Sequence, residues 1–356
     1  MAVKKYIVGI LFIALMFSSY LYLADNYNIH TVEYAFVGDI SYKQFDDLRK
    51  STKALVKKTS ANTELICVLN FIGSFKGNKL IMTTGYDNLI KNISMVKGRF
   101  IGGIQAREAV LGDKVADKLF RSIDVVGQVI SINKQGYKIV GVIKNSEDIY
   151  ITFDESSNVN WSKKNVKFII ENQKFLYLYT EMLESKLRIL NLEVLERVVY
   201  KQEAYLYINI MLITIILLLI KATKKQIGRV IRSTKETYDE YREQSRYIEF
   251  IEYLKKHINA IYQIIIKLFL SAIYLSAIIT CIAILQIPPT AIPNNLFALS
   301  SYVEVINLNA NNYIKRLDYG IIGITRDGLI INLIILIAMI GAQFYMNKSR
   351  PYKKKI

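Results

Sequence analysis

The pattern of hydrophobic and polar residues divides the chain into four long apolar runs and a large mixed region between the first two. The runs cover residues 6–24, 205–220, 268–287 and 328–346. A helix needs about 20 apolar residues to cross the hydrocarbon core. Because lipid offers no hydrogen-bond partners, the backbone N–H and C=O groups of a span must bond to one another, as they do in a helix. The pattern therefore predicts four transmembrane helices, in the segments 1–27, 204–222, 268–287 and 328–356, the last of which includes a basic tail.

The first run has the basic start of a signal peptide, at Lys4 and Lys5, but not its length or its ending. Signal peptides have an apolar core of about 7–15 residues and small residues before the cleavage site. Here the run is longer and ends on Tyr22, Leu23 and Ala24. We therefore expect an uncleaved membrane anchor.

The distribution of Lys and Arg predicts the orientation of the spans, because short cytoplasmic flanks carry an excess of these residues. The segment 221–258 has ten basic and six acidic residues, and the tail after Met346 has five basic residues and no acidic one. With four spans, both segments and the N-terminus lie on one side. We expect a multi-pass protein of a bacterial cell membrane with both termini in the cytoplasm and residues 28–203 outside.

The outer segment 28–203 shows both helical and strand periodicities. Its strands and helices do not alternate as repeated β-α-β units, which predicts an α+β domain inserted between the first and second spans. The expected helices lie at 40–58, 113–120 and 175–190, and Asp113 is expected to cap the second of them. The expected strands form a hairpin of 64–75 with 80–84, a strand at 109–112, a hairpin of 128–132 with 137–143 in which Gly136 supplies a positive φ, and a strand at 166–170. Residues 87–96 are expected to be a short helix or loop, and residues 192–204 lead into the second span.

The segment 223–267, between the second and third spans, is predicted to be helical and cytoplasmic or interfacial. It has no glycine or proline after Gly228. Asn259, Gln263 and Lys267 form a polar stripe at a spacing of four, typical of a helix lying in the membrane interface with Lys267 reaching the headgroups. The segment 288–327, between the third and fourth spans, is expected to be an extracytoplasmic loop.

Composition agrees with a membrane protein that carries a sizeable aqueous domain. The 356 residues are 52% hydrophobic with a mean hydropathy of +0.23 and a net charge of +17. The positive-inside bias and attraction to anionic lipid account for that charge, and no basic face with interleaved aromatic residues points to nucleic acid. Of the two cysteines, Cys67 is expected outside, in an apolar run that predicts a buried strand, and Cys281 lies in the third span, so we expect no disulfide.

Residues for nucleotide or catalytic chemistry are missing from the sequence. There is no phosphate-binding G-x-x-x-x-G-K-[ST] run, and the two histidines, His30 and His257, are expected on opposite sides of the membrane. The adjacent acidic pairs are typical of solvated loops. We therefore expect no enzyme activity and no catalytic, cofactor-binding or metal-binding residues in this chain.

A motif in the outer segment resembles the extracytoplasmic core domain of MacB/FtsX-like ABC transporter permeases. The resemblance rests on a GRF turn, an LGDKVADKLF helix, a VGQVI strand start and a YKIVGVI strand, in the family's order and spacing. The family-motif residues, which we expect to be structural, are Gly98, Arg99, Phe100, Leu111, Gly112, Ala116, Leu119, Phe120, Gly127, Val140, Gly141 and Val142.

The resemblance implies a permease subunit that binds a separate cytoplasmic ABC ATPase, with ATP bound in that partner. It also implies a second permease chain, identical or different, contact with membrane lipid and an extracytoplasmic partner. The candidate ATPase-docking residues are Tyr247, Phe250, Ile251, Leu254 and Lys255. The sequence departs from the family at this point, because the usual short Gly-containing loop is replaced by about 38 residues.

A second interpretation remains open at this stage. The long cytoplasmic segment also suits a membrane-anchored sensor or regulatory scaffold without ATP coupling. The cargo and its direction of movement do not follow from the sequence under either interpretation.

Overall fold

The computed structural model describes residues 2–59, 65–102, 106–156, 161–170, 176–244, 249–287, 291–321 and 323–347. The chain divides into two compact units, which we describe separately. The head unit comprises residues 19–204 and 289–347, and the arm unit comprises residues 1–18, 205–288 and 348–356.

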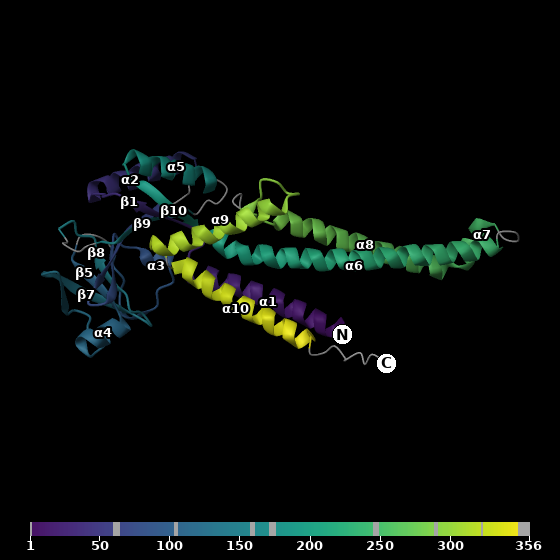
Figure 1. Ribbon diagram of the computed structural model, residues 1–356, viewed down its shortest axis with the longest axis horizontal. Coiled ribbons are helices and arrows are strands. Elements are labelled where there is room, and N and C mark those ends of the chain that lie inside the picture. The colour runs from purple at the N-terminus through teal and green to yellow at the C-terminus, as the bar shows by residue number, and fades with distance from the viewer. Residues whose placement is uncertain are drawn as a thin grey trace. The chain divides into compact units, whose positions relative to one another are not determined.

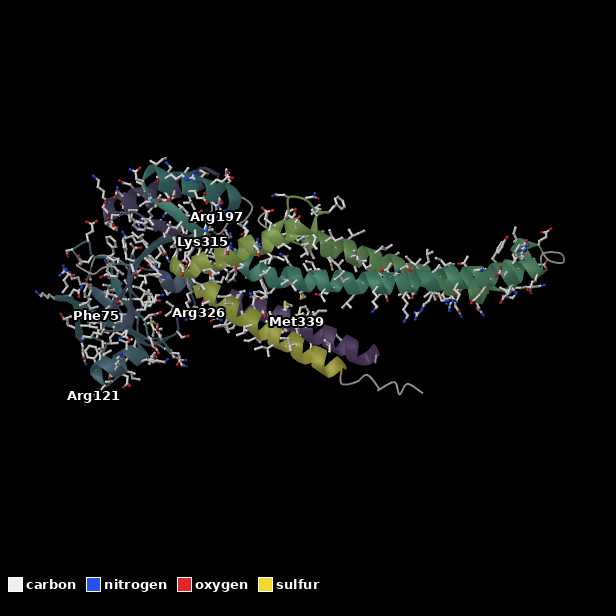
Figure 2. All side chains as sticks on the ribbon, in the orientation of Figure 1. Phe75, Arg121, Arg197, Lys315, Arg326 and Met339 are labelled. Atoms are coloured by element: carbon white, nitrogen blue, oxygen red, sulfur yellow. The ribbon has the colours of Figure 1, made fainter. Side chains whose placement is uncertain are left out.

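Four helices are long and apolar enough to cross a membrane, as the hydrophobic pattern predicted. They are α1 (Ala2–Asn26), α6 (Tyr200–Gln244), α8 (Ile258–Ile284) and α10 (Gly323–Asn347). Many of their aliphatic side chains are exposed, for example Met339 on α10 at 52% (Figure 2). These exposures suit helices that are solvated by lipid.

The head unit is built on one mixed sheet of ten strands, so the predicted α+β class is confirmed (Figure 1). The strand order is β10-β1-β9-β2-β3-β8-β5-β7-β4, with β6 paired to β7. Only the β3–β8 and β5–β7 pairs are parallel. The strands are β1 (Thr31–Val37), β2 (Leu65–Phe75), β3 (Asn78–Thr83), β4 (Met95–Gly98), β5 (Glu108–Gly112), β6 (Val129–Ile132), β7 (Gln135–Ile143), β8 (Ile149–Thr152), β9 (Lys163–Ile170) and β10 (Glu193–Val199).

The main hydrophobic core lies on one face of this sheet. Helices α2 (Tyr42–Thr59) and α5 (Leu176–Ile189) pack side by side over one half of that face, and α4 (Asp113–Phe120) packs beside β5 and β7 in the other half (Figure 1). Alternate residues of each strand point into the core, as the two-residue period of a strand requires. On β9 these are Val166, Phe168 and Ile170.

Several local predictions hold, among them the hairpin of β2 and β3 and helices α2, α4 and α5. Cys67 is a buried thiol on β2, and burial raises its pKa. Other details were wrong. The positive φ of the β6–β7 turn falls on Asn133 and Lys134 and not on Gly136. The cap position of α4 is Gly112, while the Asp113 carboxylate accepts backbone hydrogen bonds from Asn145 and Ser146.

The short helix expected within 87–96 is present as α3 (Asp87–Ile90), although the end of that segment begins β4. Two longer segments differ from expectation. The segment 192–204 contains an edge strand, β10. The segment 288–327, expected to be a loop, contains the 20-residue helix α9 (Leu299–Asp318). Polar residues interrupt its apolar stripe, which hid the helix from a search for spans.

Candidate functional site

The family-motif residues gather in one half of the head unit, on β4, β5, α4 and β7 and in the turns that follow β4 and precede β6. Leu111 and Val142 are fully buried on neighbouring strands, and Ala116 is buried on the helix that covers them. Leu119 and Phe120 pack on the same core, and Phe100 lies edge-on to Tyr150 at 5.2 Å between ring centroids. These are packing contacts, and the structural role that we expect for the motif residues stays a prediction.

Two motif glycines lie at positions where the neighbouring backbone leaves no room for a side chain. Gly98 and Gly141 are cross-strand partners on β4 and β7. A Cβ at Gly141 would lie 2.3 Å from the Arg99 carbonyl oxygen, and one at Gly98 would lie 2.2 Å from the Val140 carbonyl oxygen. Gly98 also has a φ of 76°, which side chains disfavour. The backbone of the GRF turn therefore approaches β7 closely at Gly141.

Arg99 is the charged residue of the motif, and it binds the carboxylate of Glu108. Its Nη1 atom donates to Glu108 at 3.1 Å and to the Phe100 carbonyl oxygen at 3.2 Å. This contact ties the GRF turn to the start of β5. Val140 and Gly127 complete the motif, the first beside the turn on β7 and the second immediately before β6, with a φ of 95°.

The candidate docking residues lie at the connection between α6 and α8 in the arm unit. Ile251 is 66% exposed on the short helix α7 (Phe250–Lys256), and Lys255 is also exposed. Phe250 and Leu254 belong to the same helix, and Tyr247 lies outside the described residues. The structure thus brings four of the five residues onto one short helix between α6 and α8, which we call the tip.

Tyr253 attaches α7 to the end of α6. It is fully buried, and its hydroxyl lies 3.3 Å from both the Thr237 carbonyl oxygen and the Glu240 carboxylate. Its ring stacks on His257 at 4.3 Å. Further along the hairpin, Lys267 Nζ donates to Ser233 Oγ at 2.6 Å. We had expected Lys267 to reach lipid headgroups, and instead it links α8 to α6.

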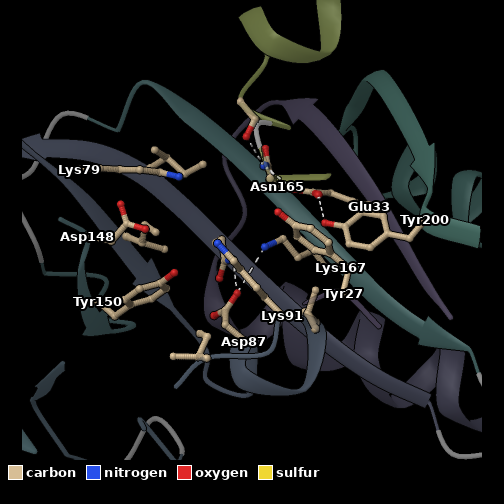
Figure 3. A pocket seen from close by; sticks show the side chains of 17 residues that line it. Tyr27, Glu33, Lys79, Asp87, Lys91, Asp148, Tyr150, Asn165, Lys167 and Tyr200 are labelled. Carbon is tan, nitrogen blue, oxygen red and sulfur yellow. Dashed lines mark hydrogen bonds and ion pairs between the residues drawn. The ribbon is translucent and has the colours of Figure 1, made fainter. Parts of the chain in front are cut away.

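A second group of polar residues, which sequence reasoning missed, lines a cavity of about 80 Å³ in the head unit (Figure 3). It lies on the sheet face opposite the main core, because its residues alternate with core residues along four strands. Glu33 alternates with Tyr34 on β1, Lys167 with Phe168 on β9, and Lys79 with Leu80 on β3. The other members of the cluster are Asn70, Asp87, Lys91, Asp148, Tyr150 and Asn165 from the domain and Tyr27 and Tyr200 from helix ends.

The buried charges of this face compensate one another. Glu33 accepts hydrogen bonds from Asn165 at 2.8 Å and from the Tyr200 hydroxyl at 2.5 Å. Asp87 accepts from Asn70 at 2.7 Å and lies 3.4 Å from Lys167 Nζ. Burial alone would lower the pKa of Lys167, but the carboxylates of Glu33 and Asp87 outweigh it and raise the pKa.

Residues at the ends of two predicted spans close the cavity within the head unit. Tyr27, at the end of α1, donates to Asp327 of α10 at 2.7 Å. Asn165 donates to the carbonyl oxygen of Gly320, in the turn between α9 and α10, at 3.2 Å. Burial raises the pKa of Tyr27, and the nearby Asp327 carboxylate adds to this effect. The cavity is therefore a place where membrane helix ends meet the outer sheet.

Helix α9 is held to the same end of the domain by an ion-pair cluster. Arg316 donates to Glu203 at 2.5 Å and to Glu196 at 3.3 Å, and all three side chains are largely buried. Burial alone would lower the pKa of Arg316, and the two carboxylates raise it. In the sequence, the strand residues of both clusters are charged residues that alternate with apolar ones. A solvent-exposed sheet face has the same pattern, and only the helices that cover this face distinguish the two cases.

Neither cluster has the composition of a metal centre. Within the part of the chain that the structure describes, no three His, Cys, Asp or Glu side chains gather as metal ligands would. Glu33 and Asp87 are instead bonded to amide, hydroxyl and ammonium donors.

Comparison with known proteins identifies the outer domain. Residues 7–176 match the family model of the MacB-like periplasmic core domain. No curated relative matches the sequence. The periplasmic region of MacB from Actinobacillus actinomycetemcomitans is similar at 16% identity and a TM-score of 0.31, over 44% of this chain and 83% of that one.

A second solved structure is the extracellular domain of the noncanonic ABC-type transporter YknZ from Gram-positive bacteria. It is similar at 15% identity and a TM-score of 0.30, over 46% of this chain and 98% of that one. The match to the family model over residues 7–176 confirms the resemblance that the motif indicated, at the level of the MacB-like periplasmic core domain.

Proposed function

We propose that the chain is the permease subunit of an ABC system in which a separate cytoplasmic ATPase moves the outer domain. It acts in a bacterial cell membrane with both termini in the cytoplasm, paired with a second permease chain. ATP binds in the ATPase, and the work done outside is export or extraction of a peptide, lipid or antibiotic, or mechanical signalling to an outer partner.

The observation that carries this proposal is the continuity of α6. It starts directly after β10, at Tyr200, and runs without a break to Gln244. At 1.5 Å per residue its 45 residues extend about 70 Å, more than twice the hydrocarbon thickness of about 30 Å. The helix that begins after the last strand of the head therefore continues as far as the segment before α7, which supports a role for α6 in carrying force along the chain.

The tip supplies a surface on which such a force can act. Ile251 and Ile258 are each about two-thirds exposed there, at 66% and 65%, beside the exposed bases Lys255 and Lys256. Exposed apolar residues rimmed by charge are typical of a protein interface. Tyr253 holds this surface to α6, so that a partner bound to α7 would pull on the long helix itself.

The experiment is co-purification of the tagged full chain from its own membranes, with Ile251→Asp as the test variant. Wild type should retain an ABC ATPase, and Ile251→Asp should reduce the retained amount at least tenfold. Ile231→Asp is the matched control, because Ile231 is a 63% exposed isoleucine on α6 away from the tip. Equal loss in both variants would exclude α7 as the docking site. Absence of any ATPase from the wild type would favour the sensor or scaffold function instead.

A further inference from the structure

The cavity of the head unit holds polar atoms that the protein itself leaves without partners. Asn70 and Asn165 are 3% and 1% exposed, and each uses its amide nitrogen as a donor. The Oδ1 atom of each has no hydrogen-bond partner. Buried acceptors without partners cost free energy, so such atoms usually mark a place for water or a ligand.

Charged groups of both signs on the same wall also lack an ion-pair partner among the described residues. Lys79 and Asp148, from β3 and the start of β8, lie on the side of the cavity away from Tyr200 (Figure 3). Neither side chain forms an ion pair with a described residue. Burial lowers the pKa of Lys79, which shows that nearby carboxylates do not fully compensate its charge. An occupant that offers both an anion and N–H donors would satisfy both groups.

A wider groove of about 640 Å³ continues from the cavity and shares Lys91, Asp148 and Tyr150 with it. Arg326, in the first turns of α10, and Lys144 also line the groove. Lys91 lies over the Tyr27 ring at 5.9 Å and has no carboxylate partner among the described residues. The groove is also lined by Lys114, Glu147 and Asp148, and Lys114 is paired with Glu147. Cations therefore outnumber acids in the groove, which suits an anionic group whose neighbouring N–H donors enter the cavity.

The position of the groove suits a membrane component. Tyr27 directly follows the span of α1, and Arg326 lies near the start of the span of α10. The cavity has room for about three water molecules, at about 30 Å³ each, which is close to the size of an aminoethyl group. The phosphate of such a group would lie where the cavity opens into the groove, at the residues that line both.

We propose that this cavity and groove bind a phosphoethanolamine group, with the ammonium donating to Asp148 and the two asparagine oxygens and the phosphate facing Lys79, Lys91 and Arg326. The group belongs to a membrane lipid or to a free phosphorylated amino alcohol. The proposal requires only that α1 and α10 span a membrane, and it does not depend on ATP coupling.

The test measures binding to the full chain in detergent by native mass spectrometry. The probes are short-chain phosphatidylethanolamine, phosphatidylcholine of the same chain length and free O-phosphoethanolamine. We expect phosphatidylethanolamine to bind at least tenfold more tightly than phosphatidylcholine, because a trimethylammonium group has no N–H to donate. Equal binding of the two lipids would overturn the proposal, since the asparagine oxygens would then have no role.

Two charge variants locate the site. Asp148→Asn and Lys79→Met should each weaken phosphatidylethanolamine binding at least tenfold. The matched controls are Asp117→Asn and Lys118→Met on α4, whose exposed side chains lie outside the cavity, and they should bind as wild type does. Binding unchanged in both cavity variants would overturn the assignment and leave the cavity to water.

The remaining comparisons distinguish a lipid ligand from a soluble one and control for a variant that fails to fold. Tighter binding of the lipid than of free O-phosphoethanolamine supports a lipid ligand, and equal binding supports a soluble one. Lys91→Gln, at the half-exposed edge of the cavity, provides a third variant if Asp148→Asn alters folding. Because no ATPase is present in these assays, their result is independent of the co-purification experiment.

Discussion

The sheet of the head unit buries charge, whereas helix α8 of the arm unit exposes hydrocarbon. In the head, Glu33 is 3% exposed and Asp87 is 4% exposed on a fully covered sheet face. In the arm, Phe269 and Ile279 on α8 are 65% and 67% exposed. Each arrangement reverses the usual rule for a protein in water, and each has its own physical reason.

The difference shows which interactions stabilise the fold of each unit. Lipid solvates the apolar side chains of the arm, so its helices need few contacts and their backbones satisfy themselves. The head must compensate every buried charge with a partner and must fit its strands closely. Substitutions that fill space or remove a partner should therefore affect the head strongly and the arm weakly.

The largest expected effect contrasts the same substitution in the two units. Gly141→Ala places a Cβ against the Arg99 carbonyl oxygen and should destabilise the head by about 3 kcal/mol. Gly228→Ala on α6 meets nothing within 4 Å and should stabilise the helix by about 0.5–1 kcal/mol.

Urea unfolding of the full chain in detergent measures the first effect. The single tryptophan, Trp161, packs against the head core, so its fluorescence reports that unit. Far-UV circular dichroism during heating follows the helices and measures the second effect. Equal destabilisation by both variants would contradict the contrast between the units.

A smaller effect should follow from removing a charge partner of α9. Arg316→Met leaves Glu196 and Glu203 unpaired in a site where the three side chains are 13–15% exposed. We expect α9 to lose about 2 kcal/mol of local stability, less than for a fully buried pair because solvent partly screens the charges. Amide hydrogen exchange in α9 should become about 30-fold faster.

Lys315→Met is the matched control, because Lys315 is the exposed neighbour of Arg316 on the same helix and forms no ion pair with a described residue. Its exchange rate should stay within about twofold of wild type. Similar acceleration in both variants would show that helix packing, and not the ion pairs, holds α9.

The regular elements of the head could be predicted because their periodicity is local. The alternation in β7 and the helical stripe of α4 depend only on which residues face the core. The four apolar helices are visible for the same reason, since their length alone sets them apart.

The cavity and α9 could not be predicted, because both depend on what covers a surface. Glu33, Lys79 and Lys167 alternate with core residues as solvent-facing residues do, and only the ends of α1, α6 and α10 make that face an interior. Similarly, Arg316 gave no signal until its distant partners, Glu196 and Glu203, were placed beside it. Long-range pairing of this kind leaves no period in the sequence.

The smallest expected effect concerns acid stability of the head. Asp154 accepts hydrogen bonds from the backbone nitrogen of Ser156 at 3.0 Å and from its hydroxyl at 2.6 Å, and Arg107 lies 3.0 Å away. Burial alone would raise the pKa of Asp154, but these partners outweigh it and lower the pKa below its ordinary value of 3.8. The carboxylate therefore contributes stability that is fully present above the unfolded pKa and is lost as pH falls through the lower, folded value.

Asp154→Asn should accordingly cost about 1 kcal/mol near pH 7 and progressively less below about pH 4, where the wild-type carboxylate also becomes protonated. Urea unfolding followed by Trp161 fluorescence at pH 7 and pH 3 measures both values. Asp124→Asn is the control, because Asp124 is 69% exposed in a surface pair with Lys97 and should cost less than about 0.5 kcal/mol at either pH. A cost for Asp154→Asn that is the same at both pH values would mean that the shape of the carboxylate, and not its compensated charge, stabilises this part of the head.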